Sequence, residues 1–500
     1  MSHALPSVNA AAAALGAVYE MQTTPLSTGG SETRLVATQY GAAIREVQLE
    51  LLNRPYGPVP ILVACVLLAC VDVLLRRPLI ALMHFRGAIR LLEERNSMST
   101  LASRSNPMDS PGCVRNRLIS KTDALPLEEG DDDITVFFRT LDVQTVLYAD
   151  GLEPQMQIAL VKTPQDPTST PSSTTVYRAG RELIALMQAC HGFTSFASQY
   201  KYSPRIFVPA ELFVEQGRQI AALKLWLRRL TYIILPSVKL SSADSSSTTT
   251  ASSEYTHGLM LRNLCLSNII YASTILNPYE TDWDVYADDF QEIVVGAESI
   301  VDNRHRRGCG TPSSKTLAFT FTPSPGIIEP LYLTALKYRE PRWRRRALEL
   351  LWQSGKEGPW DGKLMAAAAQ RAIKIEESEM LVRDMESSIG GGQAGVRQEH
   401  AGRERLANIV PERVRISGCG PGNDADAEGI VSYWEWTKEW LLVGQGGCSI
   451  DRRNVSPVRF SRCRDVDKML AEGLNGKAEG EEAPWKDKRH WEMWTETIEF

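Results

Sequence analysis

The 500-residue chain lacks the cysteine pattern of a zinc or disulfide protein. Its nine cysteines stand at positions 65, 70, 113, 190, 265, 309, 419, 448 and 463, an odd number with irregular spacing. Zinc sites usually draw on closely spaced, repeated cysteine pairs, because the thiolates must converge on one ion. The sequence therefore predicts no zinc site and no disulfide framework, and we expect free thiols in a reducing, intracellular setting.

A basic excess and a long hydrophobic run are also missing. With 55 basic and 60 acidic side chains the formal net charge is −5, so no direct DNA binding is expected from this chain. The longest apolar stretch, residues 61–71, ends at Asp72 and falls short of the roughly 18 residues of a membrane span. We interpret residues 60–75 as a buried core helix, and the N-terminus lacks the pattern of a secretory signal.

Motifs of catalysis are absent from the sequence. It contains no Gly-x-Ser-x-Gly elbow, no Walker loop and no histidine pair at helical zinc spacing, so we predict no enzyme and no catalytic, cofactor-binding or metal-binding residue. His84 stands alone on a predicted helix, which favours a structural role. Gly390, Gly392 and Gly395 fit Gly-x-Gly-x-x-Gly but follow a charged helix rather than a strand; a flexible break is the better interpretation.

Residues 424–435 resemble a calcium-binding EF-hand loop. Oxygen-bearing side chains and a glycine occupy its expected positions, namely Asp424, Asp426, Glu428, Gly429 and Glu435. The preceding Ser-Gly-Cys-Gly-Pro-Gly-Asn cannot form the entering helix, and no second copy exists. Two interpretations stand, a calcium loop and an acidic loop that opens a helix at Ser432, and the missing entering helix favours the second.

The sequence does contain helical periodicity along most of its length. Apolar residues recur at steps of three and four in several stretches, for example Tyr40, Ile44, Val47 and Leu51, or Tyr286, Phe290, Ile293, Ala297 and Ile300. Pro341 favours a helix start, and Asp361 can cap a second helix. Only residues 316–322 and 410–416 are weak strand candidates. The pattern predicts an all-α fold, an array of packed helix pairs.

Composition suggests where this array is interrupted. Residues 97–133, 163–175 and 241–253 are rich in Ser, Thr, Pro or acid, and we expect them to be disordered insertions because they cannot bury enough apolar surface. We predict one helical domain over residues 1–385, a Gly-rich and charged linker over 386–415, and a Trp-rich tail of uncertain order over 416–500.

A basic cluster stands in the most motif-dense part of the chain, and it comprises Lys337, Arg339, Arg342, Arg344, Arg345 and Arg346. The cluster could bind phosphate. Neighbouring acids such as Glu340 and Glu349 instead favour a solvated helix face on which the basic side chains form ion pairs. On this interpretation replacing Arg344 and Arg345 costs little stability. Trp343 would belong to the core.

Residues 321–377 closely resemble the regulatory region of fungal transcription factors of the zinc binuclear cluster type. The matching motifs follow one another as Gly326–Ile328, Pro330–Tyr332, Arg339–Pro341, Arg344–Arg346, Glu357–Asp361 and Ile373–Glu377, with Glu340 in place of the usual Asp. Upstream, residues 39–48, 84–94, 137–150 and 279–294 have counterparts in the same order. The resemblance covers about residues 4–385 and does not extend well beyond Ile416.

This resemblance implies a non-catalytic helical body involved in the regulation of transcription. In the family such a body modulates activity, dimerises or receives a ligand, and it works in the nucleus. The six-cysteine module that binds zinc and DNA in this family has no counterpart here, and without it the cytoplasm is an alternative location. Loss of the module, a gene model that starts at an internal Met and a truncated product all remain open explanations.

A second interpretation comes from the first predicted helix pair. The pair resembles a tetratricopeptide-like hairpin. Its second helix ends in His-Phe-Arg-Gly-Ala-Ile-Arg-Leu-Leu-Glu-Glu, residues 84–94. The alternative function is therefore a helical protein-binding scaffold unrelated to transcription.

Overall fold

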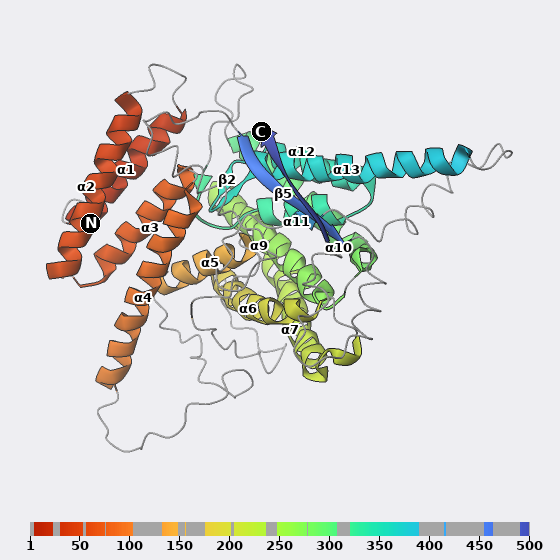
Figure 1. Ribbon diagram of the computed structural model, residues 1–500. Coiled ribbons are helices and arrows are strands. Elements are labelled where there is room, and N and C mark those ends of the chain that lie inside the picture. Colours follow the sequence, from red (N-terminus) through yellow and green to blue (C-terminus); the bar gives the residue numbers. More distant parts are fainter. Residues whose placement is uncertain are drawn as a thin grey trace, which may run out of the picture. The chain divides into compact units, whose positions relative to one another are not determined.

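The computed structural model describes residues 5–23, 31–53, 57–75, 77–103, 133–148, 156, 176–201, 205–236, 248–277, 279–307, 321–389, 415–416, 455–463 and 491–499. These residues are overwhelmingly helical, so the predicted all-α array of packed helix pairs is confirmed (Figure 1). The chain divides into two compact units. The first extends from the N-terminus to Thr145 and includes Met156, and the second contains α6 and all later elements.

The first unit is built from two consecutive helix pairs. Helices α1 (Pro6–Thr23) and α2 (Ser31–Asn53) form one pair, α3 (Val59–Leu74) and α4 (Pro78–Ser103) form the next, and α5 (Asp133–Tyr148) follows. Helix α3 packs against α1, α2 and α4. Leu62, Leu68 and Val71 are fully buried on it, as a helix that is apolar on most sides requires.

The interpretation of residues 60–75 as a core helix is therefore confirmed. No helix in the described part of the chain is long and apolar enough to cross a membrane.

Helix α9 (Thr248–Thr274) forms the centre of the second unit. It packs against α6 (Val176–Ala197), α7 (Ala210–Arg229), α10 (Ala287–Arg307) and α11 (Ile328–Lys337), and Figure 1 shows it among them. Three consecutive residues, Leu264, Cys265 and Leu266, are buried. Successive residues on a helix point in different directions, so their burial means that neighbours cover α9 on several sides.

Short helical turns connect these helices. They are the 3₁₀ turns η2 (Ser198–Tyr200), η3 (Arg205–Phe207) and η5 (Glu280–Tyr286) and the π-helical turn η4 (Leu230–Ile234). Helices α12 (Pro341–Trp352) and α13 (Gly362–Ile389) complete the helical part of the unit. Pro341 starts α12, and Asp361 stands directly before α13, as predicted.

Two small sheets accompany the helices. β1 (Phe321–Thr322), β2 (Lys356–Glu357) and β3 (Trp360–Asp361) form one, and β4 (Arg415–Ile416), β5 (Val455–Cys463) and β6 (Trp491–Glu499) form the other. The two weak strand candidates, residues 316–322 and 410–416, therefore contain the two-residue strands β1 and β4 at their C-terminal ends. The antiparallel pairing of β5 with β6, from Val455 opposite Glu499 to Cys463 opposite Trp491, lies within the tail whose order the sequence did not predict.

Two helices extend into the predicted insertions. α4 continues to Ser103, seven residues into the segment 97–133, and α9 begins at Thr248, within 241–253. Ser and Thr are only mildly unfavourable in helices, so a helix held by tertiary packing can extend through them. Residues 104–132, 163–175 and 241–247 lie outside the described residues. α13 ends at Ile389, directly before the Gly-rich break, and residues 390–414 also lie outside.

We predict that Leu68→Ala lowers the free energy of unfolding by about 2–5 kcal/mol, because it leaves a cavity inside the first unit. Denaturant unfolding followed by circular dichroism measures this change. Leu52 of α2 is 82% exposed, so Leu52→Ala is the matched control and should change stability by no more than about 0.5 kcal/mol. Equal losses in the two variants would contradict the position of α3 in the core.

Candidate functional site

The motif-dense segment, residues 321–377, is organised around the buried carboxyl group of Glu357. Its Oε2 atom accepts a hydrogen bond of 2.8 Å from the backbone N–H of Ile328, at the start of α11. A carboxylate at this end also interacts favourably with the helix dipole. Glu357 on β2 thereby caps a helix that begins 29 residues earlier in the sequence.

Gly326 leaves the space that this carboxyl group occupies. A Cβ atom at residue 326 would lie 2.2 Å from Oε1 and 2.4 Å from Cδ of Glu357, well inside van der Waals contact. The glycine of the Gly-Ile-Ile motif and the glutamate of the Glu-Gly-x-Trp-Asp motif therefore fit each other. Arg304 of α10 lies 3.6 Å from Oε1 and supplies a positive charge.

The rest of the Glu-Gly-x-Trp-Asp motif forms a tight turn. Gly358 has φ of +55°, in the left-handed region that glycine adopts at little cost, and its N–H donates to the carbonyl of Thr322 at 2.6 Å. Trp360 is buried and contacts Tyr332 with ring centroids 6.1 Å apart. Asp361 accepts from the N–H groups of Lys363 (3.1 Å) and Leu364 (3.4 Å) and caps α13.

The Arg-Glu-Pro motif starts α12 in the same way. The carboxylate of Glu340 accepts a hydrogen bond of 3.0 Å from the N–H of Trp343, and Pro341 occupies the first helical turn. Proline suits this place because its missing N–H would have no partner inside the helix. Glu340 is thus a helix cap and not the arginine partner that the sequence suggested.

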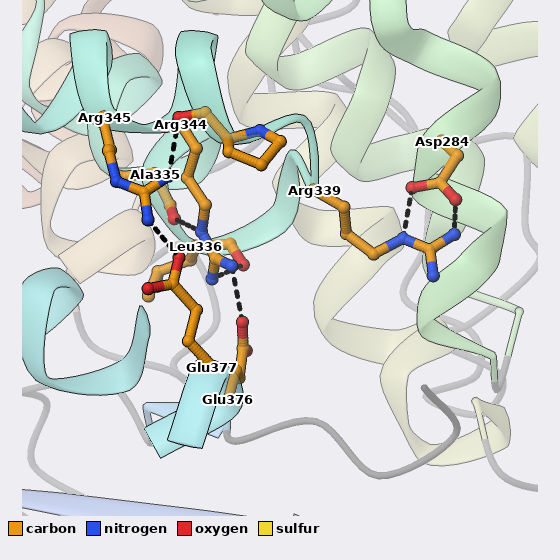
Figure 2. A network of polar contacts seen from close by, with 9 residues as sticks. Asp284, Ala335, Leu336, Arg339, Arg344, Arg345, Glu376 and Glu377 are labelled. Atoms are coloured by element: carbon orange, nitrogen blue, oxygen red, sulfur yellow. Dashed lines mark hydrogen bonds and ion pairs between the residues drawn. The ribbon is translucent and has the colours of Figure 1, made fainter. Parts of the chain in front are cut away.

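Arg344 contradicts the predicted solvated face. It is only 6% exposed, and its guanidinium group donates to the carbonyls of Ala335 (2.7 Å) and Leu336 (3.3 Å). Its Nη1 lies 2.6 Å from Oε2 of Glu376 on α13. Figure 2 shows the side chain between these groups. Arg344 therefore satisfies carbonyls in the last turn of α11, which lack helical partners, and joins α11, α12 and α13.

Arg345 and Arg346 of the basic cluster pair with acids on several elements. Arg345 forms an ion pair of 2.6 Å with Glu377, which Figure 2 draws, and its side chain is half exposed. Arg346 pairs with Glu298 and, at 2.7 Å, with Glu349. These pairs agree with the predicted face of ion pairs, although only Glu349 belongs to the same helix.

Arg339 and the two remaining cations extend the cluster toward η5 and the tryptophans. Nε of Arg339 donates to Asp284 of η5 at 2.7 Å (Figure 2). The ammonium group of Lys337 lies 5.1 Å from the ring centroid of Trp283, and Arg342 lies 5.7 Å from that of Trp343. In such cation–π contacts the positive charge faces an aromatic ring of the same chain. Trp343 itself is half-buried and packs against a core cluster that includes Phe290 and Tyr338.

Burial changes the acidity of two carboxyl groups in this segment. It raises the pKa of Glu357 above the ordinary value, while the Ile328 N–H and Arg304 act in the opposite direction. Burial also raises the pKa of Glu329 to about 7, although Ser267 donates to its Oε2 at 2.9 Å. Glu329 lies in the first turn of α11, and Glu357 of β2 lies against the same turn.

The remaining candidates of the sequence do not join this segment. His84 lies in the first unit, beside Tyr40 of α2 and Asp72 of α3. Gly390, Gly392 and Gly395 and the acidic loop 424–435 lie outside the described residues. Among the residues that are described, no three His, Cys, Asp or Glu side chains are grouped so as to hold a metal ion.

We compared the chain with models of protein families, with curated proteins and with solved structures, and none of them matches.

Neighbouring arginines provide a matched test of the basic cluster. We predict that Arg344→Ala lowers the free energy of unfolding by about 3–5 kcal/mol, because it leaves a nearly buried Glu376 unpaired and two carbonyls without a donor. Arg345→Ala should cost no more than about 1 kcal/mol, since its ion pair is solvent-exposed. Denaturant unfolding followed by tryptophan fluorescence measures both, and the opposite ranking would contradict this assignment.

A second prediction concerns the close approach of Gly326 and Glu357. Gly326→Ala should destabilise the second unit by about 1–3 kcal/mol, because the new methyl group displaces a buried carboxyl group. Gly87→Ala is the control: an added Cβ there meets nothing within 4 Å, and alanine in a helix is about 1 kcal/mol more favourable than glycine. Thermal unfolding should therefore show shifts of opposite sign.

Proposed function

We propose that the chain is a non-catalytic regulatory body that acts in the regulation of transcription, as in the fungal zinc binuclear cluster factors that residues 321–377 resemble. One observation carries this proposal. Motifs that match the family in order fill complementary structural roles, with Gly326 giving space to Glu357 and Glu357 capping α11. When motifs depend on each other in this way, a shared fold explains their joint presence better than a chance similarity of composition does.

The charges of the motif segment also support a regulatory rather than a catalytic role. Several of its acids cap helices, as Glu340 and Asp361 do, or pair with arginines, as Glu376 does. A catalytic acid or base must be within reach of a substrate, whereas these groups contact other parts of the same unit. The proposed action is through protein partners or self-association in the nucleus, with DNA contact supplied by another module.

A DNA-tethering experiment tests this proposal. We expect residues 1–500, fused to a heterologous sequence-specific DNA-binding module, to change transcription of a reporter several-fold relative to the module alone. Arg344→Ala should lose most of this effect because the second unit is destabilised, whereas Arg345→Ala should keep it. Reporter output is the measurement, with fusion protein levels determined in parallel. A folded, DNA-bound fusion that leaves transcription unchanged would contradict the proposal.

The alternative function is a protein-binding scaffold unrelated to transcription. It is favoured by the first unit, where the pair α1–α2 packs on the pair α3–α4 through α1 and α3, an arrangement also found in stacked helical repeats. The tethering experiment separates the two functions. A scaffold would bind its partner but leave the reporter unchanged.

A further inference from the structure

Three polar side chains from three different helices meet inside the first unit. The hydroxyl of Tyr40 on α2 lies 2.9 Å from Oδ2 of Asp72 on α3 and 2.9 Å from Nε2 of His84 on α4. Nε2 of His84 lies 3.5 Å from the same Oδ2 atom. Tyr40 therefore stands between an acid and a base, within hydrogen-bond distance of both.

The acid of this cluster is held in an unfavourable place for a negative charge. Asp72 is 0% exposed, and its Oδ1 atom has no hydrogen-bond partner among the described residues. Burial raises its pKa from 3.8 to about 7, although the hydrogen bond from Tyr40 and the positive charge of Arg77 act in the opposite direction. Burial also lowers the pKa of His84 and raises that of Tyr40.

Few other charges influence the cluster. Arg77, in the turn between α3 and α4, acts on both Asp72 and Tyr40. Helix α1 also packs on α3 and carries Tyr19 and Glu20 as its ionisable groups, but the pKa shifts of Asp72, Tyr40 and His84 are caused chiefly by burial. The protonation of the cluster is therefore decided mainly by its own three members and Arg77.

The geometry allows two complete hydrogen-bond chains of opposite direction. When Asp72 carries a proton on Oδ2, it donates to Tyr40, whose hydroxyl donates to the unprotonated Nε2 of His84. When Asp72 is ionised, Nε2–H of His84 donates to Tyr40, whose hydroxyl donates to the carboxylate. Both chains contain two hydrogen bonds between the same atoms. They differ in one proton on the cluster and in which ring nitrogen of neutral His84 bears hydrogen.

We infer that Asp72, Tyr40 and His84 form a proton-binding site that couples the packing of α2, α3 and α4 to pH. With the proton bound, the cluster is uncharged and fully hydrogen-bonded along the chain from Asp72 to His84. Loss of the proton leaves a buried carboxylate between the three helices and reverses the chain. The first unit is then less stable. The cluster is therefore a regulatory element separate from the motif segment of the second unit.

Asp72 and His84 affect stability with opposite signs. Because folding raises the pKa of Asp72, its contribution is fully present below about pH 4 and is lost as the pH rises through about 7. Because folding lowers the pKa of His84 from 6.5, its contribution is present above about pH 6.5 and is lost as the pH falls. Just below pH 6.5 the unfolded chain begins to carry a proton on His84 while the folded chain carries one on Asp72, so the two opposite pH dependences partly cancel there.

Single variants separate these contributions. We expect the stability of His84→Gln, measured relative to the double variant Asp72→Asn/His84→Gln, to fall as the pH rises from about 4 to about 7. The stability of Asp72→Asn, against the same reference, should instead rise with pH up to about 6.5. Because each single variant is compared with the double variant, the pH dependence of all other groups cancels in the difference. Slopes of the same sign, or no slope in either single variant, would overturn the inference.

A spectroscopic measurement tests the reversal of the chain directly. In the full-length protein labelled with ¹⁵N-histidine, we expect Nε2 of His84 to change from unprotonated to protonated as the pH rises through about 7. Tyr40→Phe removes the bridging hydroxyl and should abolish this change. Asp72→Asn assigns the transition to the carboxyl group. A His84 tautomer that stays the same across this pH change in the wild-type protein would overturn the proposal.

Discussion

The second unit depends on ionisable side chains that are buried at the two ends of α11, where they form hydrogen bonds with its backbone. Glu357 is placed against the first turn of α11, and Arg344 against the last turn of the same helix. Both side chains come from later parts of the sequence, so the two ends of this ten-residue helix are completed by residues outside it. A buried charge without such partners would be strongly unfavourable. The relative positions of α11, α12 and α13 follow from this requirement.

The requirement also explains the unusual density of motifs in residues 321–377. Gly326 provides space, Gly358 provides a backbone conformation, and Glu340 and Asp361 begin the following helices. Each residue meets a need that few other residue types could meet. A segment of this kind is recognisable in sequence because its geometry is demanding, even when its side chains bind nothing outside the protein.

Local features were predictable from the sequence, and contacts between distant residues were not. The starts of α12 and α13 follow from Pro341 and Asp361, which act within one turn. The burial of Arg344 was missed, although it shares a helix face with Ala347 and Leu351 at steps of three and seven. A charged residue on that face signals a buried partner, but the partner Glu376 stands 32 residues later and no periodicity reveals it. The contact of Gly326 with Glu357 was missed for the same reason.

The two strands β5 and β6 have a consequence for the order in which the protein is made. Arg371 of α13 forms a bidentate ion pair with Glu496 of β6, which stands 125 residues later in the sequence. Ile498 of the same strand is buried. During synthesis α13 leaves the ribosome long before these residues exist, while domains tend to fold from the N-terminal side first. The helices of the second unit must therefore persist without this contact until β6 has been synthesised.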